Sequence, residues 1–201
     1  MAIFKVATDP ATGEKRIYDS IEQVENLIHY ICRDSIMTEL NNMFPMTVDN
    51  IINQMLYIQS CKGGRLSTRA LHYILSFDTD GWEREIGTNE IYDCLLALHM
   101  SALPFGINEH QCIACLHDKP GNKHLHIVIN PVNIKTNKIL HITPCQYQFL
   151  LKDFAKNLYM RYRIALQGVS YVREDGAFSY ADGTHFLYEN RTYAHQSMFR
   201  N

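Results

Sequence analysis

The chain has 201 residues, of which 46% are hydrophobic and 20% are charged, and its formal net charge at pH 7 is −2. This length predicts one well-buried domain with a short extension, and the composition excludes a largely disordered chain. The near-zero net charge excludes a protein that coats nucleic acid non-specifically, so any DNA binding must come from local basic clusters.

The N-terminus and the cysteines predict a cytoplasmic protein without membrane insertion. Residues 1–10 lack the unbroken apolar stretch of a secretion signal, and the apolar run 94–107 is too short to span a bilayer. The six cysteines form no compact disulfide framework, which fits a reducing compartment. Cys112 and Cys115 have a zinc-like spacing, but on a strand their thiols point to opposite faces, and we interpret them as packing residues.

The first predicted elements are a β-hairpin and a helix. Residues 2–7 and 15–18 have strand character and flank a turn at 9–13. Ser20 and the glutamine three residues later form a capping box, and apolar residues at helical spacing extend the helix through residue 31. Tyr30 lies in its last turns, where a tyrosine is ordinarily a partly buried core residue.

A second helix is predicted from Thr47 or Asp49 to about Gln59, and a basic loop follows it. The loop and its borders carry Lys62, Arg65 and Arg69. These side chains suit contacts with DNA phosphates, and the alternative is an ordinary solvated surface loop.

Residues 70–77 are predicted to form a strand with His72, Ile74 and Ser76 on one face. After a turn at 78–81, Thr88 begins a helix that ends before Pro104. A long helix is then predicted from Thr143 and Pro144, stopped at Gly168.

Between these two helices the sequence predicts a second β-hairpin, with strands at 112–116 and 124–130 and a turn at 118–123. Side-chain alternation places His124, His126 and Asn130 on one face, opposite an apolar face that we expect to be buried. Symmetric closure of the hairpin places His117 opposite His124. Three neutral imidazoles then converge as a divalent cation requires, whereas a lone His-x-His is more often solvated or part of a core.

Residues 169–201 interleave aromatic residues with arginines. This pattern suits stacking on single-stranded bases, and it equally suits a short hairpin packed on the body of the protein. We predict a domain at 1–168 and an extension at 169–201. Hairpin-linked central strands among helices predict the α+β class, with a central antiparallel sheet flanked by helices.

Three motifs in this order resemble those of plasmid mobilisation relaxases. Leu-Ile-His-Tyr-Ile at 27–31 is similar to their nucleophile motif, and His-Tyr-Ile-Leu-Ser-Phe at 72–77 to their serine motif. The histidine hairpin, with Gly-Ile-Asn-Glu-His-Gln before it and Pro131 to His141 after it, is similar to their third motif. These nicking enzymes belong to the histidine-hydrophobe-histidine endonuclease superfamily, and the likeness is to the branch of broad-host-range plasmid and Agrobacterium-type relaxases.

The resemblance, which spans residues 20–166, implies the palm-like relaxase fold and a set of site residues. Tyr30 would be the nucleophile, and Ser76 would contact or position DNA near the scissile phosphate. The metal ligands would be His117, His124 and His126, with magnesium or manganese as the expected ion and zinc as another acceptable one. Asp118 and Asn130 would support the ligands, and the DNA-binding residues would be Lys62, Arg65, Arg69, Lys119 and Lys123.

The implied reaction is the nicking and rejoining of one DNA strand at a transfer origin, through a 5′-phosphotyrosyl intermediate. The implied partners are single-stranded DNA beside a hairpin, accessory relaxosome proteins and a coupling or secretion system, in the cytoplasm of a bacterium. Two positions differ from the family pattern: Lys119 stands where an Asp is common, and Arg33 and Thr38 replace a Lys-Thr pair. The alternatives are a non-cleaving DNA-binding module with a structural metal and a rolling-circle replication initiator.

Overall fold

The computed structural model describes residues 2–7, 15–78, 86–119, 122–162, 164, 166, 170–172 and 177–179. The chain divides into two compact units. We call residues 4–80 and 106–140 the sheet unit, and residues 1–3, 81–105 and 141–201 the helical unit. Within the described part of the chain, no helix combines the length and the apolar character needed to cross a bilayer.

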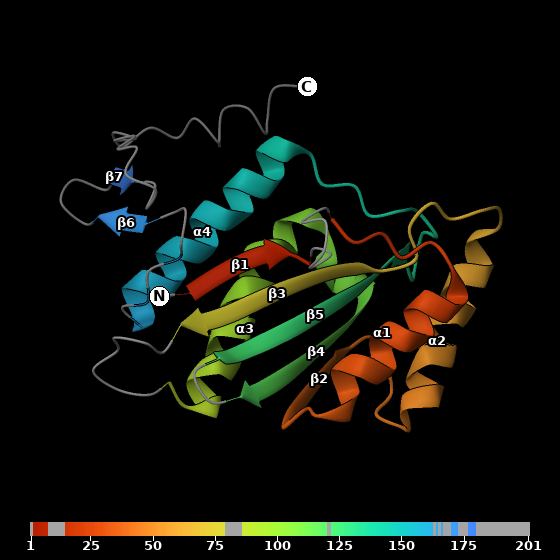
Figure 1. Cartoon of the computed structure of the whole chain (residues 1–201). Helices are drawn as coiled ribbons and strands as arrows, with labels where there is room; N and C mark the ends of the chain where they lie inside the picture. Colours follow the sequence, from red (N-terminus) through yellow and green to blue (C-terminus); the bar gives the residue numbers. More distant parts are fainter. Residues whose placement is uncertain are drawn as a thin grey trace. The chain divides into compact units, whose positions relative to one another are not determined.

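A five-stranded antiparallel sheet has the strand order β1-β3-β5-β4-β2 (Figure 1). Its strands are β1 (Ala2–Val6), β2 (Met37–Asn41), β3 (Leu71–Asp78), β4 (His110–Lys119) and β5 (Asn122–Asn133). The two long strands β4 and β5 form the predicted hairpin, and each is extended beyond the predicted limits, so that only residues 120 and 121 separate them. With the helices beside it, this sheet confirms the predicted α+β class.

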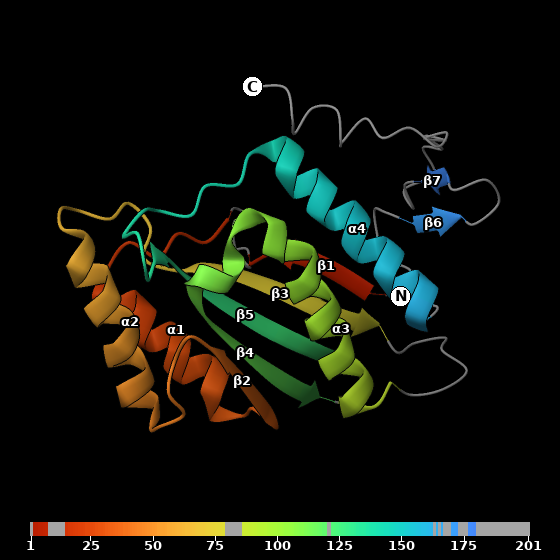
Figure 2. The ribbon, with the colours of Figure 1, turned by 180° about the vertical axis from the view of Figure 1, so that it is seen from behind.

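Helices α1 (Ile21–Arg33) and α2 (Val48–Lys62) lie side by side against one face of the sheet, as Figures 1 and 2 show from opposite sides. The predicted capping box is present at the start of α1, where the Ser20 side chain accepts from the backbone N–H of Gln23. The core beneath the helices consists of Tyr18, Val24, Leu27, Ile28, Ile31, Ile51, Ile52, Met55, Ala70, Ile113, Cys115 and Val128. Burial of this apolar face provides most of the driving force that holds α1 on the sheet.

The helical unit contains α3 (Thr88–Ala102) and α4 (Pro144–Tyr162), which pack against each other. Ser101 of α3 donates a 2.7 Å hydrogen bond to Asp153 of α4, and Asn157 donates to the same carboxylate. Two short strands, β6 (Ser170–Val172) and β7 (Ala177–Ser179), form a separate antiparallel pair. The 3-10 turns η1 (Leu103–Phe105) and η2 (Ile107–Glu109) follow α3.

The structure corrects several sequence expectations. Residues 15–18 do not form a strand: Tyr18 makes an isolated bridge to Ala70, and β1 pairs with β3 instead. The edge strand β2, which pairs with β4, is an element that sequence analysis missed. The histidine face of β5 is also largely buried, because α1 and α2 cover it, whereas we expected burial of the apolar face alone.

Helix α4 ends at Tyr162, before the stop predicted at Gly168. Asp78 is the last residue of β3, whereas the predicted turn at 9–13, residues 79–81 of the turn predicted at 78–81 and the stop at Gly168 lie outside the described residues. The same holds for the aromatic and arginine residues of the extension, apart from the backbone of β6 and β7.

We predict that Ile28→Ala lowers the free energy of unfolding by about 2–5 kcal/mol, because Ile28 is fully buried between α1 and the sheet. Ile21→Ala on the same helix is the matched control, since the Ile21 side chain is 46% exposed. Its expected effect is within about 0.5 kcal/mol. Denaturant unfolding followed by circular dichroism measures both, and equal losses would contradict the proposed packing of α1.

Candidate active site

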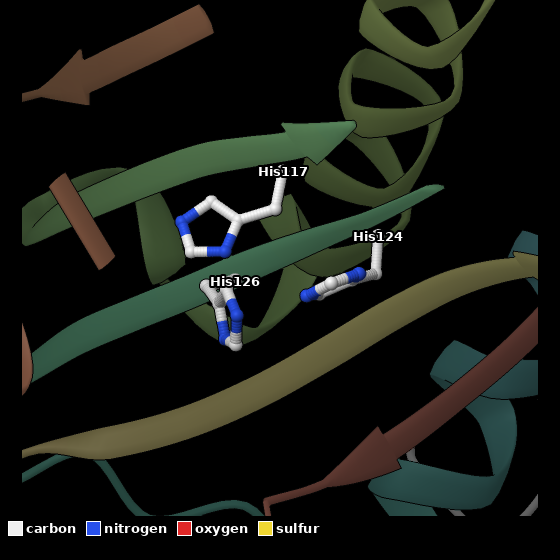
Figure 3. A group of neighbouring side chains, drawn as sticks. All are labelled: His117, His124 and His126. Carbon is white, nitrogen blue, oxygen red and sulfur yellow. The ribbon is translucent and has the colours of Figure 1, made fainter. Parts of the chain in front are cut away.

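The β4–β5 hairpin brings three histidines together on the face that α1 covers. His117 pairs directly with His124, which confirms the predicted register, and His126 follows two residues later on the same face of β5. One ligand nitrogen from each ring lies within 4.8 Å of the other two. Figure 3 shows His117 on β4 and the other two rings on β5, turned toward one another.

Each ring is held through one of its nitrogens. Nε2 of His117 donates to the Ile31 carbonyl of α1 at 2.8 Å, and Nδ1 of His124 donates to the Asn122 carbonyl at 3.0 Å. Nδ1 of His126 lies 2.9 Å from Nε2 of a fourth histidine, His72. The second nitrogens of His117 and His126, Nδ1 and Nε2 respectively, are buried and have no hydrogen-bond partner.

This arrangement fits a divalent cation. Buried polar atoms are nearly always paired, so two unpaired nitrogens in one cluster indicate a function outside the fold itself. Metal-bound histidines characteristically donate their other ring N–H to a carbonyl or a similar acceptor, as His117 and His124 do here. The three residues that would hold the ion are therefore His117, His124 and His126.

Burial favours the neutral form of His72, His124 and His126. Desolvation, helped by neighbouring histidines and Lys119, lowers the pKa of His126 to about 3. Desolvation also lowers the pKa of His124 from its ordinary value. The pKa of His72 is lowered to about 4 by burial and by the charge of Arg16. Neutral rings retain the lone pairs that a metal ion needs.

Tyr30 lies on α1 beside the cluster of His117, His124 and His126, which we call the triad. Its ring packs edge-on against His126 and His117, with ring centroids 5.4 Å and 5.9 Å apart, and 45% of the residue is exposed to solvent. The bond from His117 to Ile31 and the contact between Cys32 and Cys115, with sulfurs 3.8 Å apart, tie this part of α1 to β4. The phenol is thus accessible to a ligand and adjacent to the imidazole cluster.

Strand β3 contributes Ser76 and His72 to the same face. Ser76 pairs directly with His124 in the sheet. His72 contacts the Tyr18 hydroxyl through Nδ1 at 2.9 Å as well as His126 through Nε2. His72 has no role among the residues predicted from the sequence. Its place on the same strand face as Ser76 was the signal that could have predicted one.

The side chains of Asn130 and Asp118 make their polar contacts with residues outside the triad. Asn130 donates to the Met55 carbonyl and to Gln111, and it accepts from the backbone of Val132, so it joins β5 to α2. Asp118 forms an ion pair with Lys123 across the hairpin at 3.5 Å. Among the hydrogen bonds of the described residues, none connects Asn130 or Asp118 to the three histidines.

The predicted DNA-binding residues fall into two groups. Lys119 and Lys123 lie on the histidine hairpin, where Lys119 is exposed and Lys123 is buried. Lys62, Arg65 and Arg69 lie at the other end of β3, and Arg69 is engaged by Gln59 and by the Asp19 carbonyl. Arg69 precedes Ser76 by seven positions, which is about 23 Å at ~3.3 Å per residue of extended strand, so the basic loop is remote from the triad.

Comparison with known proteins identifies one related family. The family model described as "Relaxase: MobA/VirD2-like, nuclease domain" matches residues 30–164, which cover more than half of the chain. The match begins at Tyr30 and includes Ser76 and the histidine hairpin. No curated protein matches the chain, and no solved structure does.

We predict that His124→Ala and His126→Ala each weaken binding of Mn²⁺ by more than about 100-fold, because loss of a ligand exceeds the ~10–100-fold cost of losing a supporting partner. The matched control is His29→Ala, which removes an exposed histidine of α1 whose partner is Asp49. Calorimetric titration of the purified chain measures the affinity. Unchanged binding in both hairpin variants would exclude the three-histidine site.

Proposed function

Because the chain belongs to the family of MobA/VirD2-like relaxases, through their nuclease domain, we propose that it nicks and rejoins one DNA strand at a transfer origin by tyrosine transesterification. Membership in this family implies nuclease activity, DNA nicking in mobilisation and binding of single-stranded DNA. The observation that carries the finer proposal is the exposed phenol of Tyr30, packed edge-on against two of three clustered histidines.

In the proposed reaction the Tyr30 oxygen attacks the scissile phosphorus. The new bond joins the tyrosine oxygen to phosphorus, and the bond from phosphorus to the 3′ oxygen breaks. The phenol proton leaves, and the departing oxygen takes up a proton to become a free 3′-hydroxyl. Because one phosphoester replaces another, the 3′-hydroxyl can reverse the reaction and reseal the strand without a further energy source.

The remaining residues bind and orient the reacting groups. A divalent ion bound by His117, His124 and His126 would supply Lewis-acid polarisation of the scissile phosphate. The histidines are neutral donors, so their side chains add no negative charge that would repel the DNA backbone. Ser76, opposite His124 in the sheet, would contact the DNA beside the scissile phosphate. Because α1 packs on this face of the sheet, the phenol and the imidazoles are held in one arrangement. Such fixed orientation of the reacting groups would increase the reaction rate.

DNA recognition would use both basic groups. Lys119, which is exposed on the face of the histidines, is proposed to contact backbone phosphates next to the nick. Lys123 is buried and paired with Asp118, so it would act only by holding the hairpin in shape. Lys62, Arg65 and Arg69 would contact a part of the DNA that lies about the length of β3 away from the nick. Asn130 would act indirectly, by keeping β5 in register with α2.

We propose as partners single-stranded DNA with an adjacent hairpin, accessory relaxosome proteins and a coupling or secretion system of a plasmid or integrative element. Residues 1–168 would form the catalytic domain, and residues 169–201 an extension that packs on it or contacts the DNA. Magnesium or manganese is the proposed ion, and zinc is also acceptable to three imidazoles.

We predict that Tyr30→Phe abolishes the covalent adduct between the protein and a single-stranded oligonucleotide carrying the nick site, because the attacking oxygen is removed. Binding of Mn²⁺ should persist, since the ring and the three histidines are unchanged. A denaturing gel of the protein with labelled oligonucleotide measures the adduct.

The matched control is Tyr57→Phe, which removes a hydroxyl from an exposed tyrosine of α2 and should leave the adduct intact. An adduct that persists in Tyr30→Phe would contradict the assignment of the nucleophile. Absence of any adduct in the unaltered protein, together with tight DNA binding, would favour the non-cleaving binding module instead.

A further inference from the structure

We propose that His72 is a positioning residue that fixes the tautomer of His126. Tyr18, the second hydrogen-bond partner of His72, in turn orients His72. This inference rests on the metal site of the proposed function. His72 would accept a hydrogen bond from Nδ1–H of His126 and so leave the lone pair of His126 Nε2 facing the cation.

The three histidines of the triad are oriented in two different ways. His117 and His124 each donate to a backbone carbonyl, which can only accept, so their tautomers are set by the main chain. His126 instead meets an imidazole nitrogen, which can either donate or accept. Its tautomer therefore depends on the state of His72.

The surroundings of His72 select the required tautomer. If His72 donated through Nε2, the N–H of His126 would be at Nε2, a buried atom without a partner. If His126 donates, His72 carries its own proton on Nδ1 and donates it to the Tyr18 oxygen at 2.9 Å. Arg16, a cation that has only donors, opposes the rise in the pKa of Tyr18 that burial causes, and such a neighbour favours this oxygen as an acceptor.

The chain of contacts connects the triad to the start of α1 and to β3. Tyr18 is buried, lies just before α1 and is bridged to Ala70 at the edge of β3. His72 is two residues further along β3 and is likewise buried. Both side chains are thus held by the fold before any ligand binds, as an orienting partner of a metal ligand must be.

The first test compares variants of His72 in calorimetric titrations of the full chain with Mn²⁺ alone. His72→Phe retains a ring but no acceptor, and it should weaken binding by about 10- to 100-fold. His72→Gln provides an amide oxygen as acceptor and should recover part of the affinity, whereas a purely packing role would favour the Phe variant. Tyr18→Phe should cause a smaller loss, and His29→Ala none. Equal affinity in His72→Phe and the unaltered chain would overturn the inference.

The second test reads the tautomer directly and needs no variant to fold. Long-range ¹H–¹⁵N spectra of the metal-free chain should show His126 protonated on Nδ1 and unprotonated on Nε2. Protonation of His126 on Nε2 would overturn the inference. Because neither readout uses DNA, a protein that gives both expected results but forms no DNA adduct supports this inference and contradicts the proposed function.

Discussion

The pairing of β4 with β5 is the constraint on which the rest of the site depends. His117 opposes His124, Cys115 opposes His126 and Ile113 opposes Val128, so one face carries first the imidazoles and then the core beneath α1 and α2. A slip of one residue would move every side chain of the shifted strand to the other face. The hydrophobic core that stabilises the sheet unit therefore also specifies the register of the triad, and burial of Ile113, Cys115 and Val128 keeps the three histidines together.

Helix α1 supplies the second half of the arrangement through the same face. Its buried stripe ends at Ile31, whose carbonyl accepts from His117, and the preceding residue, Tyr30, is directed toward the imidazoles. The position of the phenol thus follows from packing of an amphipathic helix and not from a flexible loop. An element fixed on a rigid sheet holds reacting groups more precisely than a loop does.

The polar residues of this buried face differ in how completely they are satisfied. Asn130 and its neighbours Gln111 and Gln59 form a closed network between β4, β5 and α2, which suits a structural role. His117 and His126 each retain an unpaired buried nitrogen. Leaving such atoms unpaired reduces stability, and proteins tolerate that mainly where a ligand or a reaction uses the atoms. The contrast separates the triad from the surrounding network.

The sequence by itself determined the local features: the α+β class, the capped helix that bears Tyr30, and the hairpin with His117 opposite His124, because each depends on alternation, capping and turn residues close together in the chain. The tertiary structure alone decided which partners those residues meet. The burial of the histidine face, the placement of Asn130 in a network with α2 and the contact of His72 with both His126 and Tyr18 depend on β3 or on the helices. The edge strand β2 depends on its pairing with β4. Such contacts join residues up to 86 positions apart, as His117 and Ile31 are, and periodicity along one strand carries no information about what packs against it.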